Sequence, residues 1–224
     1  MYTSLFLDLD NTLLDFNKAE TYAISKVLKE NRLPFDEPTV KLYSKINRSF
    51  WESFECGDIP KSAIYTGRFE KLLSVLERNG DPQSLSKQYG EALSYGFFTV
   101  DGAFALLDYL KNKAYGIYAT TNGLSTTQYR RIEGSGLGKY FDKVFVSEDA
   151  GHQKPEKAYF DYVISNIPEN DKSKMLIVGD SQSSDILGGV NAGIDTCWYN
   201  PEGLKAKYPS KYTIASLEEL MSIL

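Results

Sequence analysis

Two carboxylates stand two residues apart, directly after an apolar run near the start of the chain. Residues Tyr2–Leu7 predict a strand, and Asp8-Leu9-Asp10-Asn11-Thr12 follows it. If the strand is buried, like charges at its carboxyl end need a cation or a shared proton to coexist. Open α/β sheets place their active sites at this end of the strands. The same residues also suit a tight turn or a helix cap, so the interpretation depends on later segments.

A second acidic pair follows another apolar run. Residues Met175–Val178 predict a strand, and Asp180 comes two residues after it, with Asp185 five residues further on. If the two strands are neighbours, Asp8, Asp10 and Asp180 converge, and such hard oxygen ligands suit Mg²⁺ better than zinc or copper. Asp185 has two equally weighted interpretations: it orients the metal site, or it caps the helix that begins there.

Two further strand ends carry weaker signals. The predicted strand Tyr115–Ala119 leads into Thr121-Asn122-Gly123, whose hydroxyl and backbone N–H groups could face a phosphate. Lys154-Pro155 follows the predicted strand Lys143–Val146. Alone, Asn-Gly is common turn chemistry and a single lysine is usually solvated. Together, the four signals lie at or soon after the ends of core strands, which favours one shared site.

The elements around these residues predict an α/β fold. Near-continuous apolar strands alternate with helices, which indicates a Rossmann-like, doubly wound parallel sheet covered on both faces. An all-helical block interrupts this core early, with turn residues rather than long linkers between its helices. We expect a core of residues 1–15 and 97–224 and a helical domain of residues 16–96. The remaining predicted elements are strand 196–199 and helices 19–29, 40–54, 63–77, 103–111, 125–133, 156–166 and 184–191.

Composition excludes several function classes. The 224 residues are 42% hydrophobic with a net charge of −5, and no basic patch indicates a nucleic-acid or membrane-surface partner. Cys56 and Cys197 offer neither a zinc pattern nor a disulfide framework, which fits a reducing cytoplasm. The first apolar run is interrupted by Asp8, and no run is long enough to span a bilayer. We therefore expect a soluble, cytoplasmic protein; no feature indicates its oligomeric state.

The four strand-end motifs resemble those of the haloacid dehalogenase superfamily, and the helical block resembles the cap domain that closes over its active site. The resemblance extends over nearly the whole chain. Other segments resemble the pyrimidine 5′-nucleotidases that remove modified nucleotides. These segments are Gly57-Asp58-Ile59, Gly67-Arg68-Phe69, Ile186-Leu187-Gly188-Gly189-Val190-Asn191-Ala192-Gly193 and Thr196-Cys197-Trp198.

The resemblance implies a Mg²⁺-dependent phosphomonoesterase that forms an aspartyl phosphate. In it, Asp8 attacks phosphorus, while Asp10 protonates the leaving oxygen and later takes a proton from water. The resemblance also implies that Asp8, the backbone carbonyl of Asp10 and Asp180 hold the metal, with Asp185 as a direct or indirect member of that site. The expected substrate is a nucleoside 5′-monophosphate, with a preference for pyrimidines.

The same resemblance assigns the phosphate and the nucleoside to different parts of the chain. Thr121, the backbone N–H of Asn122 and Lys154 are expected to bind the phosphoryl oxygens. Aromatic and polar side chains of the helical block are candidates for contacting the base, although packing between helices explains most aromatics at such spacing. These candidates are Asn17, Trp51 and Arg68, together with Phe16 and Tyr65.

Four alternative functions share parts of this pattern. A haloacid dehalogenase would leave Asp10 and Asp180 as idle, mutually repulsive charges. A phosphoacceptor signalling domain would carry its acceptor after a later strand and lack the helical insert. A phosphosugar phosphatase or mutase also fits the motifs and stays open, although the groups that a mutase needs to hold a bisphosphorylated intermediate are not identifiable in the sequence. A catalytically silent phospholigand-binding protein also stays open, although Asp8, Asp10 and Lys154 are all present. His152 has no task in the expected chemistry.

Overall fold

The computed structural model describes residues 1–224, which form two compact units. One unit comprises Met1–Asp15 and Phe98–Leu224, and the other comprises Phe16–Phe97. The helical unit therefore extends one residue beyond the predicted boundary at residue 96. The ring of Phe97 lies 6.1 Å from that of Tyr95, which associates Phe97 with the end of the helical segment.

The first unit is built on a six-stranded sheet in the order β3-β2-β1-β4-β5-β6, and every neighbouring pair is parallel. The sheet confirms the predicted α/β fold class. The register sets Leu7 of β1 opposite Ala119 of β2 and Val178 of β4, so these three strands end together. The strands are β1 Ser4–Leu7, β2 Gly116–Thr121, β3 Lys143–Val146, β4 Met175–Gly179, β5 Asp195–Tyr199 and β6 Tyr212–Ile214.

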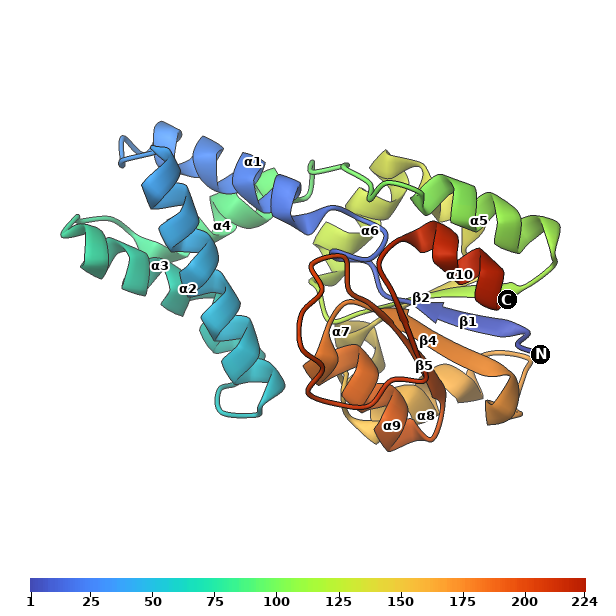
Figure 1. Cartoon of the computed structure of the whole chain (residues 1–224). Helices are drawn as coiled ribbons and strands as arrows, with labels where there is room; N and C mark the ends of the chain where they lie inside the picture. Colours follow the sequence, from blue (N-terminus) through green and yellow to red (C-terminus); the bar gives the residue numbers. More distant parts are fainter. The chain divides into compact units, whose positions relative to one another are not determined.

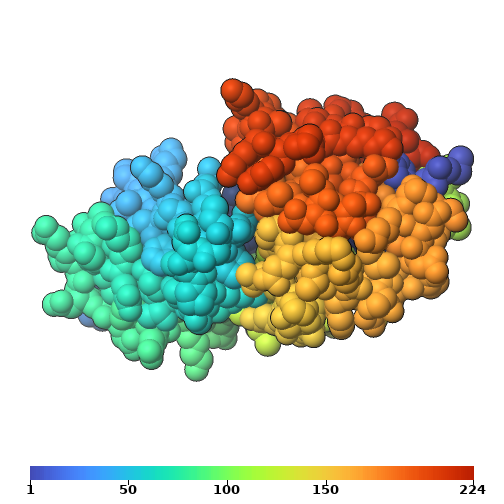
Figure 2. All heavy atoms as spheres, turned by 90° about the horizontal axis from the view of Figure 1, so that it is seen from below, coloured from blue at the N-terminus to red at the C-terminus, as the bar shows by residue number.

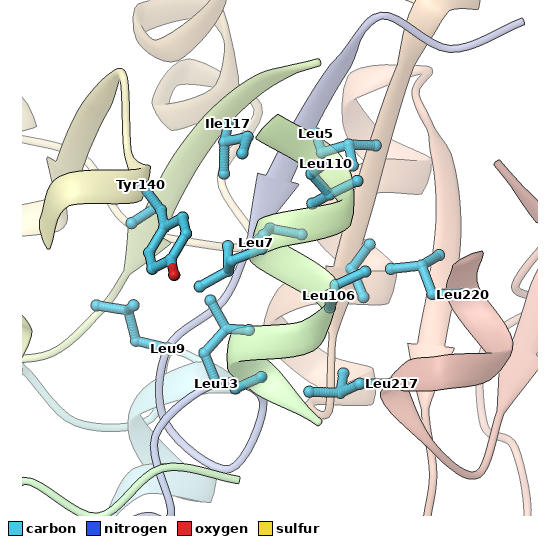
Figure 3. Close-up of a cluster of buried hydrophobic side chains, with 14 of the residues drawn as sticks. Leu5, Leu7, Leu9, Leu13, Leu106, Leu110, Ile117, Tyr140, Leu217 and Leu220 are labelled. Carbon is cyan, nitrogen blue, oxygen red and sulfur yellow. The ribbon is translucent and has the colours of Figure 1, made fainter. Parts of the chain in front are cut away.

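Helices cover both faces of this sheet. Because side chains alternate along a strand, Leu5 and Leu7 enter a core with Leu106, Leu110 and Leu217 (Figure 3). Phe6 points to the opposite face, where it joins a second core under α8 and α9. Figure 1 shows α5 and α10 on one side of the sheet and α8 and α9 on the other. The helices of this unit are α5 Ala103–Asn112, α6 Ser125–Ser135, α7 Ser147–Ala150, α8 Lys157–Ser165, α9 Leu187–Ala192 and α10 Leu217–Ile223.

The second unit is all-helical, with α1 Phe16–Glu30, α2 Glu37–Glu55, α3 Lys61–Leu76 and α4 Pro82–Leu93. Local chemistry starts two of these helices: Asp36 and Asp81 accept hydrogen bonds from the first turns of α2 and α4. The rings of Tyr43, Phe69 and Tyr89 pack together in its core, with centroids 5.2–5.8 Å apart. In Figure 2 the light-blue to green atoms of this unit form one body, and none of the six strands lies within its residues.

Three differences from the predicted elements concern short segments. Strand β6, helix α10 and the single turn α7 were not predicted, because three to seven residues give too little periodicity to detect. The predicted helix 184–191 is a π-helical turn, η3 Gln182–Ile186, followed by α9. Two 3₁₀ turns, η1 Leu137–Tyr140 and η2 Lys172–Lys174, precede β3 and β4. None of the helices is long and apolar enough to cross a membrane.

Candidate active site

The carboxyl ends of β1 and β4 position the first acids. The backbone N–H of Asp8 donates to the carbonyl of Val178 at 2.9 Å, so the strand pairing continues one residue past β1. Asp180 follows β4, and its N–H donates to the Thr12 hydroxyl at 3.1 Å. The indole of Trp198, on β5, donates to the carbonyl of Asp180 at 2.8 Å. Neighbouring strands therefore fix the backbone that carries both carboxylates.

Asp8, Asp180 and Asp185 form one acidic cluster. Each offers a carboxylate oxygen, and these oxygens lie within 4.8 Å of one another. Of the predicted convergence of Asp8, Asp10 and Asp180, the cluster contains Asp8 and Asp180, and its third carboxylate is that of Asp185 rather than that of Asp10. An all-oxygen donor set of this kind fits Mg²⁺, which prefers a few carboxylates and keeps several waters.

Lys154 is the cation of this cluster. Its ammonium donates to Asp8 Oδ1 and Asp185 Oδ1, each at 2.6 Å, and to the carbonyl of Thr120 at 2.9 Å. Only 1% of Lys154 and 7% of Asp8 are exposed. All three donor hydrogens of the ammonium are therefore used inside the protein.

Burial and charge act in opposite directions on these groups. Desolvation is the largest influence on Asp8 and raises the pKa of its carboxyl to about 7, against the lowering effect of Lys154. Desolvation alone would lower the pKa of Lys154, but the carboxylates of Asp185 and Asp8 outweigh it and raise that pKa. The lysine therefore stays charged. The cluster contains three carboxyl groups but only this one cation.

The structure gives Asp185 contacts that fit both interpretations. The hydroxyl of Ser181 caps the π-helical turn by accepting from the N–H of Ser184 at 3.2 Å, and the carboxylate of Asp185 reaches back to the N–H of this cap residue. Asp185 is fully buried, and it accepts from Lys154 and from the N–H of Ser181. A Cβ on Gly179 would overlap the Asp185 carboxyl group, so a glycine at the end of β4 is what allows this approach.

Asn122 holds Lys154 through a two-way amide contact. Its Nδ2 donates to the carbonyl of Lys154 at 2.8 Å, and its Oδ1 accepts from the N–H of Lys154 at 2.9 Å. The Asn122 side chain therefore positions the lysine, a role that the sequence analysis did not predict. The Thr121 hydroxyl accepts from the N–H of Gly123 at 3.0 Å. Binding of phosphate by Thr121, the Asn122 N–H and Lys154 stays a prediction.

Asp10 has different partners from Asp8. Its carboxylate accepts from Gln128 Nε2 at 2.9 Å and from Arg131 Nη1, both on α6. The sequence analysis missed these two residues. The available signal was their spacing, because positions i and i+3 of a helix share one face. That face of α6 is the buried one.

The candidates in the helical unit have unequal surroundings. Arg68 is only 5% exposed, donates to Asn47 Oδ1 at 2.8 Å and lies 4.5 Å from the centroid of Tyr89. Trp51 is half-buried, with its ring 5.7 Å from that of Phe54, and Asn17 is exposed. Substrate contact by Asn17, Trp51 and Arg68 stays a prediction. His152 is exposed, with Nδ1 3.4 Å from a carboxylate oxygen of Glu156.

The sequence of this chain matches the family model of the haloacid dehalogenase-like hydrolases over residues 5–199. A crystal structure of the putative HAD-hydrolase YfnB from Bacillus subtilis, bound to magnesium, superimposes on it with a TM-score of 0.95. The superposition covers 99% of this chain and 98% of the YfnB chain, and the two sequences are 39% identical. The similarity therefore extends over both units.

Two relatives carry a named activity. The pyrimidine 5′-nucleotidase PynA from Streptococcus pneumoniae is 37% identical over 100% of this chain and 95% of its own length. The pyrimidine 5′-nucleotidase YjjG from Escherichia coli is 34% identical over 98% of this chain and 96% of its own length. Both alignments include the strand ends and the helical unit.

Proposed function

This chain belongs to the haloacid dehalogenase-like hydrolases and is a phosphatase of that family; within it, we propose a Mg²⁺-dependent 5′-nucleotidase that hydrolyses pyrimidine nucleoside monophosphates. The observation that carries the chemistry is the cluster of Asp8, Asp180, Asp185 and Lys154 at the ends of β1 and β4. It combines a buried carboxylate, a donor set for a divalent cation and a fixed ammonium group. Phosphoryl transfer needs these three elements.

The proposed reaction has two steps, each with a proton transfer. A carboxylate oxygen of Asp8 attacks phosphorus, the bond to the ester oxygen breaks, and that oxygen takes a proton from the Asp10 carboxyl. Water then attacks the aspartyl phosphate and gives a proton to Asp10, which releases phosphate and regenerates the Asp8 carboxylate. Thr121 and the Asn122 N–H bind the phosphoryl oxygens, and Lys154 exchanges one of its three protein acceptors for a phosphoryl oxygen and offsets its charge.

Asp8, Asp180 and Asp185, with the backbone carbonyl of Asp10, would hold the magnesium ion. When bound, the ion neutralises charge on the nucleophile and on the phosphoryl group. The protein prepares for this by keeping Asp8 next to Lys154, which aims the carboxylate, and by limiting exposure of Asp8 to 7%. The surrounding structure thereby excludes most competing water.

The nucleotide preference rests on the two pyrimidine 5′-nucleotidase relatives, whose alignments include the helical unit. In this proposal, the core binds the phosphate and the helical unit distinguishes the nucleoside. Asn17, Trp51 and Arg68 are the candidate contacts, because amide, indole and guanidinium groups hydrogen-bond to or stack on bases.

A phosphatase screen with and without EDTA, repeated with Asp8→Asn, tests the chemistry. We expect hydrolysis to require Mg²⁺ and the variant to lose about 10⁴-fold or more of kcat, since removing a covalent nucleophile has effects of this size. Phosphate release from UMP, dUMP, dTMP, AMP and sugar phosphates is the measurement. Lys157→Met, which removes an exposed lysine from α8, is the control for nonspecific effects.

Each part of the proposal has its own contradictory outcome. Metal-independent turnover, or full activity of Asp8→Asn, would reject the mechanism. Efficient hydrolysis of sugar phosphates without hydrolysis of any nucleotide would reject the nucleotidase and favour a phosphosugar phosphatase. Tight binding of phosphate esters without turnover of any of them would favour a silent phospholigand-binding protein.

A further inference from the structure

The buried face of α6 carries two polar side chains that the proposed reaction does not use. Gln128 is 1% exposed and Arg131 is fully buried. Both donate hydrogen bonds to Asp10. Asp10 precedes the helical unit in the sequence, whereas Gln128 and Arg131 follow it. A buried guanidinium is unusual unless it is paired, so its contact with a carboxylate needs an explanation.

Together with Thr121, the three side chains form a connected set of hydrogen bonds. Arg131 Nη1 donates to Asp10 Oδ1 and, at 3.1 Å, to Gln128 Oε1. Gln128 Nε2 donates to Asp10 Oδ2 at 2.9 Å and to the Thr121 hydroxyl at 2.8 Å. Each carboxylate oxygen of Asp10 thus has its own donor, and this fixes the rotation of the carboxyl group. The Gln128 amide links Asp10 to the hydroxyl expected to bind phosphate.

Gly123 provides the space for this arrangement. A Cβ at this position would lie 2.6 Å from Gln128 Cγ and 2.7 Å from Gln128 Nε2. Any larger residue at 123 would therefore displace the amide from Asp10 and Thr121. The turn after β2 and the inner face of α6 are fitted to each other at this point.

We propose that Gln128 and Arg131 are positioning residues that aim the Asp10 carboxyl group at the ester oxygen of the substrate. This inference rests on the proposed function, because it assigns a task to the acid of that reaction. As phosphorus bonds to Asp8, the ester oxygen leaves with the bonding electron pair and takes the proton of Asp10. A proton must arrive from the correct direction at this moment, which requires a carboxyl group that cannot rotate.

The leaving group separates positioning from a general structural role. An alkoxide is strongly basic and needs the proton, whereas 2,4-dinitrophenolate leaves without it. The measured quantity is kcat/KM, which reports the steps up to cleavage of the ester bond. The substrates are 2,4-dinitrophenyl phosphate and whichever alkyl monophosphate the wild type hydrolyses best, glycerol phosphate included, so the comparison does not depend on nucleotide preference.

We expect Arg131→Lys, Gln128→Leu and Gly123→Ala to lower kcat/KM for the alkyl phosphate by about 10²-fold, the lower range of general-acid effects. The value for 2,4-dinitrophenyl phosphate should change little. Arg131→Lys keeps the charge, and Gly123→Ala keeps the Gln128 amide but displaces it, so at least one variant should fold. Arg130→Lys, at the exposed neighbouring position of α6, is the matched control and should affect neither substrate.

Asp10→Asn serves as the reference. If it is selective for the alkyl phosphate while the α6 and Gly123 variants lower both substrates equally or not at all, the positioning role is wrong and the proposed reaction stands. If Asp10→Asn itself shows no selectivity, Asp10 is not the acid, and both proposals fail at that residue.

Discussion

Two buried polar clusters of this protein differ in their charge balance. The strand-end cluster contains Asp8, Asp180 and Asp185 around one cation, Lys154. The helical-unit cluster contains one buried acid and one buried cation, Glu20 and Arg68, joined by the amide of Asn47. Asn47 Nδ2 donates to Glu20 Oε1 at 2.7 Å, and its Oδ1 accepts from Arg68 at 2.8 Å.

The difference teaches which of the two clusters needs a bound cation. In the helical unit, Glu20 and Arg68 balance each other, and neutral aromatic rings surround the guanidinium. At the strand ends the acids exceed the cation, and such an excess persists in a folded protein only where a bound cation or proton completes it. The helical-unit cluster therefore needs no ligand for its charge balance, whereas the strand-end cluster does.

The largest effect should follow from unbalancing the strand-end cluster further. Lys154→Met leaves Asp8 and Asp185 buried without their cation, and we expect the free energy of unfolding to fall by about 3–5 kcal/mol. Added Mg²⁺ should restore more stability to this variant than to the wild type, since a cation binds the folded state. Urea unfolding with and without Mg²⁺ measures both effects. Lys157→Met removes an exposed ion pair with Asp161 and should change stability little; equal effects of the two substitutions would contradict the comparison.

A smaller effect is expected from breaking the balanced cluster. Arg68→Met removes the donor to Asn47 and a buried cation that acts on Glu20, which should cost about 1–3 kcal/mol of unfolding free energy. Mg²⁺ should restore no stability beyond its effect on the wild type. Lys87→Met, at an exposed position of α4, is the control. A raised KM for nucleotides, with an unchanged KM for 2,4-dinitrophenyl phosphate, would show that Arg68 also contacts the nucleoside.

The smallest expected effect is a pH dependence caused by Glu20. Burial raises the pKa of its carboxyl above the usual 4.5, although Asn47 and Arg68 lower it. At pH values between the usual pKa of the unfolded chain and the raised pKa of the folded protein, Glu20 keeps its proton only in the folded state. The stability of the protein therefore falls as pH rises through this window. We expect the wild type, but not Glu20→Gln, to lose stability as pH rises through this window. Parallel stability curves of the two proteins over this pH range would contradict the assignment.

Much of the fold follows from local patterns. The apolar runs that became β1, β2 and β4 were recognisable because buried parallel strands are continuously hydrophobic. Long helices with one apolar face were equally clear, and α1, α2 and α3 occupy the expected segments. Strand β6 was missed because it pairs only with β5, and one of its three residues is buried. Its position depends on a neighbour rather than on its own sequence.

The site also contains residues that the sequence alone reveals and residues that only the structure places. Asp8, Asp180 and Lys154 could be found from sequence because each stands at or soon after a strand end, where its type is unusual. The role of Asp185 could not be decided from the sequence, because an acid at the start of a helix fits both a metal ligand and a helix cap. The approach of Asp185 to Lys154 depends on Gly179, because a Cβ there would overlap the Asp185 carboxyl group. Only the folded structure shows that these two residues are in contact.

By itself, the sequence determined which strands are buried, which acids, hydroxyl and lysine follow them, and therefore which chemistry the chain can perform. These properties depend on residues close together in the chain, where periodicity and residue type suffice. Only the tertiary structure decided that Gln128 and Arg131 hold Asp10, that Asn122 holds Lys154 and that Arg68 is buried beside Asn47. Each of these contacts joins separate elements, so it exists only after strand order and helix packing have brought them together.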